Sequence, residues 1–161
     1  MTIKTVRQYP DEMLRKRARR VEVFDERLSQ LAIDLRDTLY HHDGIGLAAP
    51  QLGVSLRVLI ALQGDGHDGC ITLVNPRIVS LSSMKSTERE GCLSLGGVWC
   101  PVTRPTWIAW RAQDITGKDI EGEADGWLAR TLMHEIDHLD GVLISDYLSR
   151  KKQQQLRRRG R

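Results

Sequence analysis

Residues 125–141 read DGWLARTLMHEIDHLDG, and this stretch decides the fold because it predicts a buried helix that carries reactive side chains. Its apolar residues recur at spacings of three and four, which is typical of a helix. Asp125 is suited to the N-cap, and Gly141 follows the last apolar turn. We therefore expect a helix over residues 126–140.

The five residues HEIDH at 134–138 place metal-binding side chains on this helix. His134 and His138 are four residues apart, so they lie one turn apart on the same face, and both imidazoles can reach one metal ion. Glu135 lies about 100° around the axis, beside such an ion, where it suits a general base acting on water. The alternative is a solvated helix face with two histidines and an acid.

The helical wheel favours the metal site. The reactive residues fall inside an apolar arc, whereas only Arg130, Asp137 and Asp140 mark a side that faces water. An unpaired buried charge is very costly, and a metal ion with its water supplies the partners that this group needs. The apolar residues that cover most of the circumference are Trp127, Leu128, Ala129, Leu132, Met133, Ile136 and Leu139.

Two histidines do not complete a catalytic metal site, which usually has three protein ligands and one open position. After the motif only Asp140 is available, and it falls on the opposite side of the wheel. Another histidine, a distant acid or a cysteine is needed. Cys92 in the segment EGCLS is a candidate because Gly91 lets the backbone approach a metal closely. A lone cysteine is otherwise a small buried hydrophobe.

The composition is that of an ordinary globular chain. Its 161 residues suit one domain, and 40% are hydrophobic and 28% charged. Three cysteines are too few, and odd in number, for a disulfide framework, so we expect reduced thiols. The chain has neither an apolar run that could span a bilayer nor the apolar core of a secretory signal, so we expect a cytoplasmic protein without membrane contact.

Charge is distributed unevenly along the chain. The net charge is +3, yet seven cations and no acid lie in the last fifteen residues, which leaves the remainder at about −4. We divide the chain into a single catalytic domain, residues 1–149, and a basic tail, residues 150–161. We expect residues 143–156 to continue as a helix whose cations face outward and whose apolar residues Ile144, Tyr147 and Leu148 face the body. The seven cations are Arg150, Lys151, Lys152, Arg157, Arg158, Arg159 and Arg161.

The remaining segments predict an α+β fold. Short antiparallel or mixed β-strands pack around a central helix that carries HExxH, with an N-terminal amphipathic helix and a short C-terminal helix. The N-terminal helix is expected over residues 25–41, with Asp25 as N-cap and Gly44 near its end, after a short helical stretch over residues 10–17. Strands are expected over 56–62, 71–76, 77–82 and 106–113, a glycine-rich turn over 64–69, and a hairpin over 115–122 with its turn at Gly117-Lys118.

Three motifs in fixed order make the chain resemble the peptide deformylase family. They are GIGLAAPQ at residues 44–51, EGCLS at 90–94 and HEIDHLDG at 134–141. The resemblance covers nearly the whole chain. Two departures stand beside these motifs: Leu95-Gly96-Gly97 replaces the usual Ile/Val-Pro-Gly run, and Met133 replaces a frequent glutamine. The lost proline predicts a looser strand and an altered rim of the substrate cleft.

The resemblance implies a role for each motif. Glu135 carries the proton, and the Gln51 side-chain amide and the Leu93 backbone N–H face the carbonyl oxygen of the substrate. Glu90 either orients a metal-binding histidine or is a surface acid. The implied metal ligands are Cys92, His134 and His138, and the candidate substrate-binding residues are Ile45, Gly46, Gly91 and Arg104.

The implied activity is hydrolysis of the N-terminal formyl group of newly made polypeptides, with release of formate. The partners are nascent formyl-methionyl peptides, whose methionine would enter an apolar pocket near Ile45, Gly91 and the His134 helix. A Cys-His-His site suits zinc or iron. The resemblance implies one Fe²⁺ ion per chain in the cell, which Zn²⁺, Ni²⁺ or Co²⁺ can replace.

Three further possibilities follow from the residues. The basic tail is a candidate ribosome contact, since bacterial members are thought to use a C-terminal helix in this way, although a solvated end explains it equally well. An HExxH zinc metallopeptidase would usually take a downstream ligand that is lacking here. An RNA-binding protein would need a recognised motif and more aromatic residues than 5%.

Overall fold

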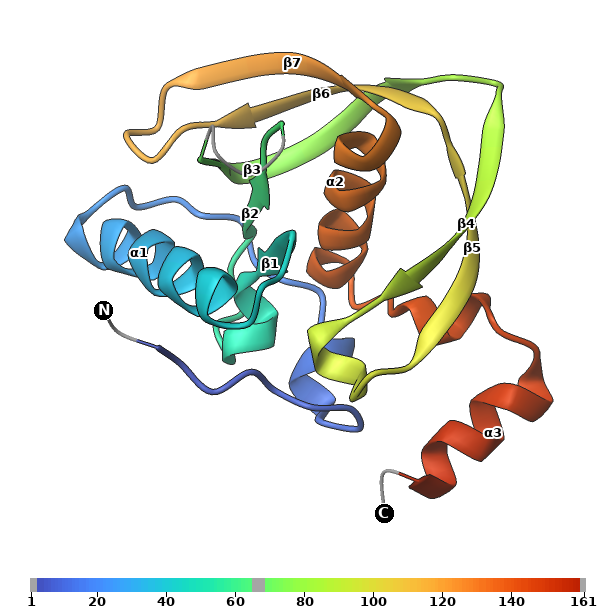
Figure 1. Ribbon diagram of the computed structural model, residues 1–161. Coiled ribbons are helices and arrows are strands. Elements are labelled where there is room, and N and C mark those ends of the chain that lie inside the picture. Colours follow the sequence, from blue (N-terminus) through green and yellow to red (C-terminus); the bar gives the residue numbers. More distant parts are fainter. Residues whose placement is uncertain (1–2, 65–68, 160–161) are drawn as a thin grey trace.

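The computed structural model describes residues 3–64 and 69–159, which form two antiparallel sheets, three α-helices and four 3₁₀ helices (Figure 1). The α-helices are α1 (Glu26–His41), α2 (Gly126–Leu139) and α3 (Arg150–Arg159). The 3₁₀ helices are η1 (Glu12–Arg15), η2 (Ala49–Leu52), η3 (Leu93–Leu95) and η4 (Ile144–Tyr147). The strands are β1 (Gly46–Ala48), β2 (Val58–Leu62), β3 (Cys70–Leu81), β4 (Lys85–Gly91), β5 (Trp99–Pro105), β6 (Trp107–Gln113) and β7 (Asp119–Asp125).

The larger sheet has the strand order β1-β2-β3-β6-β7, and every neighbouring pair is antiparallel. Strand β2 is apolar throughout because both of its faces are covered. Leu59 and Ala61 belong to the core on the α2 side, whereas Val58 and Ile60 belong to the core on the α1 side. Alternating residues of this one strand therefore belong to two separate hydrophobic cores.

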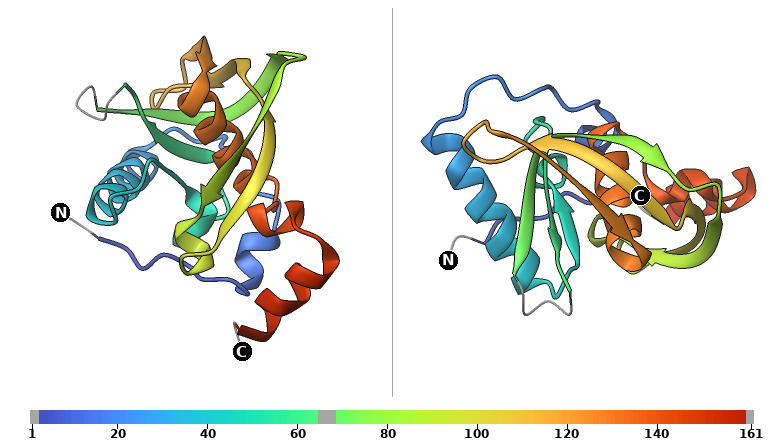
Figure 2. Two further views of the ribbon diagram at one scale, coloured as in Figure 1. Left: turned by 45° about the vertical axis from the view of Figure 1, so that its right-hand side comes forward. Right: turned by 90° about the horizontal axis from the view of Figure 1, so that it is seen from above.

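Helices α1 and α2 cover opposite faces of this sheet, as both views in Figure 2 show. Helix α1 begins where its sequence predicts, because the Asp25 carboxylate accepts hydrogen bonds from the N–H groups of Arg27 and Leu28, at 3.0 and 3.1 Å. Helix α2 packs Leu132 and Leu139 onto the other face. Each helix buries one apolar face against the sheet.

The smaller sheet, β4–β5, continues the ribbon formed by β3 and β6 and bends away from the larger sheet (Figure 1). Ser82 stabilises the bend. Its hydroxyl oxygen accepts hydrogen bonds from the N–H groups of Thr106 and Trp107, at 3.1 and 3.2 Å, and donates to the Met84 carbonyl at 2.8 Å. Backbone groups that leave the ladder thus keep partners, and the bent ribbon brings β4 and β5 alongside α2.

The expected α+β class is confirmed, as are the N-terminal helix, the strand at 106–113 and the hairpin after it. The two strands expected at 71–76 and 77–82 are one strand, β3, whose pairing with β6 shifts register twice. Asn75 sits at the first shift with φ +52°, and its side chain bonds to both backbone groups of Val21. Part of the turn expected at 64–69 lies outside the described residues.

The expected continuous helix over 143–156 is wrong. Helix η4 ends at Tyr147, Leu148 is extended with φ −83° and ψ 158°, and α3 begins only at Arg150. Tertiary contacts cause the break, because Ile144 is buried against β5 while the Tyr147 hydroxyl donates a hydrogen bond to Asp137 at 2.9 Å. Among the described residues, no helix is long and apolar enough to cross a membrane.

Candidate metal centre

One thiol and two imidazoles meet at the C-terminal half of α2. Helix α2 supplies His134 and His138, and Cys92 lies between the end of β4 and η3. The three possible ligand atoms all lie within 4.8 Å of one another, and Cys92 Sγ is 3.3 Å from His138 Nε2. Tetrahedral coordination by one thiolate and two imidazoles places such atoms about 3.5 Å apart. The spacing therefore fits a metal ion.

The two histidines differ in protonation, and only His138 is neutral in the metal-free protein. Burial, together with the positive charges of His134 and Arg104, lowers the pKa of His138 well below its ordinary value, so its imidazole is neutral and able to bind a metal. Burial also acts to lower the pKa of His134, but contacts with Cys92 and Glu90 outweigh it and raise the pKa to about 10. Metal binding at His134 must therefore release a proton.

Glu135 is buried beside this cluster, with only 3% of the residue exposed. Burial raises the pKa of its carboxyl to about 7, and Oε2 has no hydrogen-bond partner among the described residues. Gly46 makes room for it, since a Cβ atom there would lie 2.5 Å from Glu135 Oε1 and 2.7 Å from Thr131 Cγ2. Strand β1 can run this close to the carboxyl only with glycine at that position.

The side-chain amide of Gln51 lies next to the Cys92 thiol. Its Oε1 accepts a hydrogen bond from the Ala48 N–H at 2.9 Å, which fixes the orientation of the amide. Its Nε2 then donates to Ser94 Oγ at 3.2 Å and lies 3.8 Å from Cys92 Sγ. Leu93, the first residue of η3, has an N–H that the helix itself leaves without an acceptor. Two donors thus lie next to the proposed metal ligand.

Ile45 and Trp99 are two exposed apolar side chains near the cluster. Ile45 is 53% exposed and precedes Gly46. Trp99 is 58% exposed, and its indole covers Gly91, where a Cβ atom would lie 3.1 Å from the ring. The Trp99 ring is a further reason for glycine at position 91, beside the close backbone approach that the sequence suggested.

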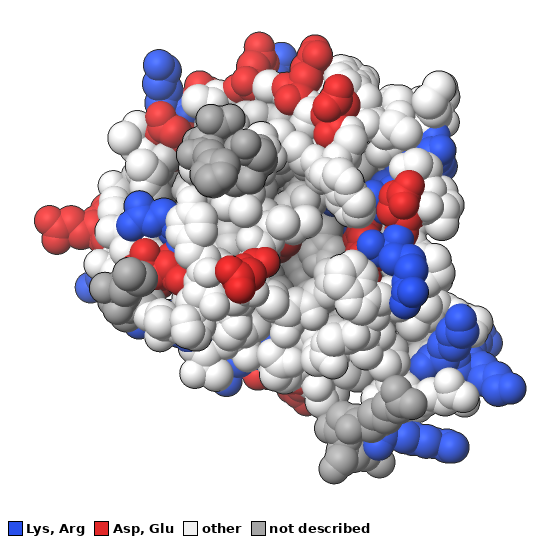
Figure 3. All heavy atoms as spheres, in the orientation of Figure 1, with Lys and Arg blue, Asp and Glu red and all other residues white. Residues whose placement is uncertain are grey.

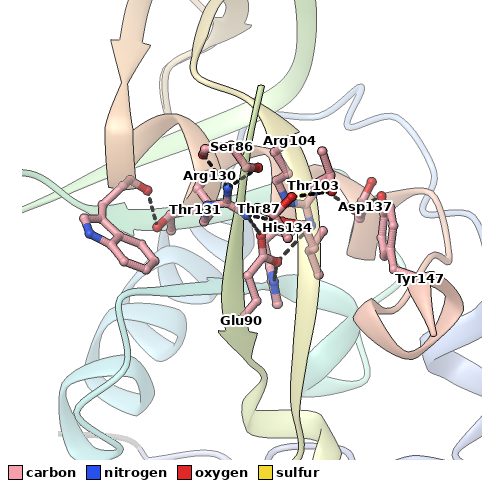
Figure 4. Close-up of polar contacts among 12 residues, drawn as sticks. Ser86, Thr87, Glu90, Thr103, Arg104, Arg130, Thr131, His134, Asp137 and Tyr147 are labelled. Carbon is pink, nitrogen blue, oxygen red and sulfur yellow. Dashed lines mark hydrogen bonds and ion pairs between the residues drawn. The ribbon is translucent and has the colours of Figure 1, made fainter. Parts of the chain in front are cut away.

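Behind the histidines lies a buried ionic cluster around Glu90 (Figure 4). Glu90 Oε2 is 2.9 Å from His134 Nδ1, and Arg104 donates to both carboxylate oxygens, at 2.6 and 3.0 Å. Burial alone would raise the pKa of Glu90, but the hydrogen bonds from His134 and Arg104 lower it to about 2. Glu90 is therefore a buried anion that contacts a histidine and not a surface acid.

Arg104 and Arg130 are both buried, which differs from what the sequence indicated for each. Arg104 was a candidate for substrate binding, but it is 4% exposed and its third nitrogen donates to Asp137 at 2.9 Å, so every nitrogen of the guanidinium is engaged by protein. Arg130 was assigned to the water-facing side of α2, but it is 5% exposed. Conversely, Trp127 from the apolar arc is 61% exposed. The signal for Arg130 was its position one turn before His134 on the same face.

The site combines possible metal ligands, two imidazoles and one thiol, with a buried carboxyl that can act as a general base. This combination is typical of a metal-dependent hydrolase. Comparison with known proteins defines which one. Residues 3–154 match the model of the polypeptide deformylase family. A peptide deformylase of Caldicellulosiruptor bescii is 45% identical over 99% of this chain and 96% of its own, and one of Clostridium botulinum is 43% identical over 94% of this chain and its entire length.

Solved structures agree with this result. A peptide deformylase crystal structure from Legionella pneumophila superposes with a TM-score of 0.91 at 44% identity and covers 98% of this chain and 92% of that one. A peptide deformylase structure from Ehrlichia chaffeensis, in complex with actinonin, superposes with a TM-score of 0.92 at 35% identity. It covers 99% of this chain and 96% of that one. The chain belongs to the peptide deformylase family, whose members are enzymes that remove N-formyl groups from nascent peptides. The alternative of an HExxH zinc metallopeptidase is not favoured.

Proposed function

We propose that Cys92, His134 and His138 hold one divalent ion at the catalytic centre, and that the helix carrying HExxH is the central catalytic element of the fold. The observation that carries the proposal is the convergence of these three donors within 4.8 Å beside a buried, partly unpaired carboxyl. The soft thiolate and the imidazoles suit iron or zinc. We assign Fe²⁺ as the ion in the cell, replaceable by Zn²⁺, Ni²⁺ or Co²⁺.

Glu135 moves the proton in this proposal. An ion held by the three ligands would act as a Lewis acid and make water nucleophilic near neutral pH. As the water oxygen attacks the formyl carbon, the Glu135 carboxylate takes the water proton, and it returns that proton to the amine nitrogen when the C–N bond breaks. Burial raises the pKa of this carboxyl toward neutrality, which suits both halves of the transfer. The products are formate and a peptide with a free N-terminus.

Gln51 and Leu93 stabilise the negative charge that develops on the formyl oxygen. The Gln51 Nε2 group is held in place through the Ala48 N–H, and the Leu93 N–H opens η3 beside Cys92. Donors fixed before the reaction cost no reorganisation during it. On the substrate side, Ile45, Gly46 and Gly91 border the site, and we place the methionine side chain against them.

The proposal removes Arg104 from the substrate-binding set. Its guanidinium is occupied by Glu90 and Asp137, so a substrate contact would require two buried ion pairs to break. Arg104 supports the site through Glu90 instead. The catalytic unit is assigned to residues 1–149, in the cytoplasm, where nascent formylated peptides are made.

The tail at residues 150–161 is proposed as an electrostatic contact to ribosomal RNA. Arg150, Lys151, Lys152 and Arg158 are exposed, and Figure 3 shows the blue side chains gathered around α3 at the lower right. The side chains of Arg157 and Arg159 and the whole of Arg161, which the sequence counted among the cations, lie outside the described residues. Cations on an exposed helix can neutralise backbone phosphates.

Substitution of the thiol tests the proposed site. Cys92→Ala should lose bound metal and formate release from formyl-Met-Ala together, because two imidazoles alone hold the ion weakly. Cys70→Ala is the matched control, since Cys70 is a free, half-buried thiol outside the cluster, and it should keep both. Metal analysis of anaerobically purified protein identifies the ion. Stoichiometric metal and normal turnover in Cys92→Ala would reject the ligand assignment.

A further inference from the structure

Glu90 is bound more completely than one histidine requires. Oε1 accepts from Arg104 Nε at 2.6 Å and from Arg130 at 2.8 Å, while Oε2 faces Arg104 at 3.0 Å and His134 Nδ1 at 2.9 Å. Two guanidinium groups and one imidazole therefore surround a single carboxylate (Figure 4). Arg104 also pairs with Asp137, so it is shared between two carboxylates, and Arg130 is the second guanidinium that reaches Glu90.

Arg130 approaches the carboxylate from the same helix as the metal ligand. It lies one turn before His134, and i,i+4 positions share a helix face. Arg130 contacts Oε1, and His134 contacts Oε2. The Glu90 carboxylate thus spans one turn of α2, with one oxygen anchored at each end.

The other nitrogen contacts of Arg130 fix the guanidinium itself. The nitrogen that reaches Glu90 also donates to the Val102 carbonyl at 2.9 Å, and the second terminal nitrogen donates to the Ser86 carbonyl and hydroxyl, at 3.0 and 2.9 Å. All of these acceptors belong to β4 and β5, and the Arg130 side chain is only 6% exposed. The arginine is therefore held rigidly between the helix and the two-stranded sheet, and it can impose a position on the carboxylate.

Arg104 has a different geometry. It binds both oxygens of Glu90 edge-on, reaches Asp137 with its third nitrogen, and lies over the Tyr147 ring at 5.3 Å. Its two hydrogen bonds to Glu90 fix the plane of the carboxylate. Arg130 adds a second hydrogen bond to Oε1, and His134 contacts the other oxygen, Oε2.

We propose that Arg130 is a positioning residue for the metal ligand His134 and acts through Glu90. The inference rests on the metal site proposed above. Arg130 holds Oε1, this directs Oε2 at Nδ1, and the histidine ring is then oriented with Nε2 toward Cys92 and the metal position. Partners that orient a metal-binding histidine typically contribute ten- to hundredfold in metal affinity.

A double-mutant cycle with Co²⁺ as the probe tests the proposal. The Kd for Co²⁺ is measured by titration of the metal-free full chain, and thermal unfolding of each variant is recorded to confirm folding. We expect Arg130→Met to bind roughly tenfold more weakly and Glu90→Gln ten- to hundredfold more weakly. The double variant should bind no more weakly than Glu90→Gln, because Arg130 acts through that carboxylate.

Two further variants complete the design. Arg130→Lys keeps a cation near Glu90 but lacks the fork that also reaches β4 and β5, so its loss should fall between wild type and Arg130→Met. It also keeps the test available if Arg130→Met does not fold. Arg111→Met removes an exposed arginine that pairs with Glu121 across β6 and β7, and it should bind Co²⁺ as wild type does.

The outcomes separate the two claims. Unchanged Co²⁺ affinity in both Arg130 variants overturns the inference alone. So does a double variant whose loss is the product of the two single losses, because that result makes Arg130 a structural tie between α2 and the small sheet. If the wild type binds no Co²⁺, the proposed metal site fails and the inference fails with it.

Discussion

Two buried glutamates, Glu135 and Glu90, flank the same histidine and differ in almost every other respect. Both residues are no more than 5% exposed. Glu135 is packed against β1, with Oε2 unpaired among the described residues and a pKa raised to about 7 by burial. Glu90 is a residue of β4, which pairs with β5, and there burial is outweighed by hydrogen bonds from His134 and Arg104 that lower its pKa to about 2.

The comparison indicates that, when burial is similar, the hydrogen-bond donors around a carboxylate decide its ionisation. With few donors, burial favours the protonated form, and the group can exchange protons near neutral pH. With four donor contacts, the same side chain stays ionised and holds its neighbours in place. One helix thus has a reactive side toward β1 and a supporting side toward the small sheet.

The largest effect is expected when Glu135 can no longer accept a proton. Glu135→Gln keeps the size and hydrogen bonding of the side chain but cannot accept a proton, so formate release should fall about 10²- to 10⁴-fold. Bound metal should remain stoichiometric because Glu135 is not assigned as a ligand. Loss of metal in this variant would instead make Glu135 a ligand or a structural support.

The second effect concerns acid stability and the supporting side. The folded pKa of Glu90, about 2, lies below its unfolded value of about 4.3, so its contribution is complete above pH 4.3 and is lost as the pH falls through about 2. The contribution is on the order of 3 kcal/mol. In urea unfolding of the metal-free protein, stability should fall more steeply between pH 5 and pH 2 in wild type than in Glu90→Gln.

Glu121→Gln is the control for this titration, because the Glu121 side chain is 70% exposed and pairs with Arg111 at the surface. Its stability should follow the wild-type pH dependence. Parallel curves for wild type and Glu90→Gln would show that Glu90 is not held as a stabilising anion.

A smaller effect should come from crowding Glu135 without removing it. In Gly46→Ala the new Cβ would lie 2.5 Å from Glu135 Oε1, so the carboxyl must shift. Misplacement of a catalytic group by less than 1 Å should lower the turnover number roughly tenfold, with metal content unchanged. Turnover equal to wild type would mean that the position of Glu135 is not critical.

The smallest effect on catalysis is expected from a region remote from both glutamates. Deletion of residues 150–161 should leave hydrolysis of a small formylated peptide nearly unchanged, because α3 contributes none of the residues assigned to the metal centre. Sedimentation with ribosomes at low salt should decrease. Equal sedimentation of the truncated and full chains would reduce the tail to a solvated end.

The reactive side was the more predictable of the two. Local spacing along α2 predicts that His134 and His138 share a face, and the apolar run of β2 predicts a fully buried strand. The supporting side depends on pairing between β4 and β5. Strand β4 is polar throughout and β5 contains two prolines, so neither sequence predicted a strand. Burial of Arg130 follows only once those strands lie against α2, and the break after Tyr147 follows only from its contact with Asp137.

The opposite ionisation of the two glutamates can be measured directly. Carboxyl carbons of the metal-free protein, labelled with ¹³C at glutamate, are followed by NMR from pH 9 to pH 4, with Glu135→Gln and Glu90→Gln used to assign the two signals. We expect the Glu135 signal to titrate with a midpoint near 7, while the Glu90 signal is still that of a carboxylate at pH 4. If both signals titrate together near pH 4.5, the two carboxyls are equivalent, and the division between a reactive and a supporting glutamate is wrong.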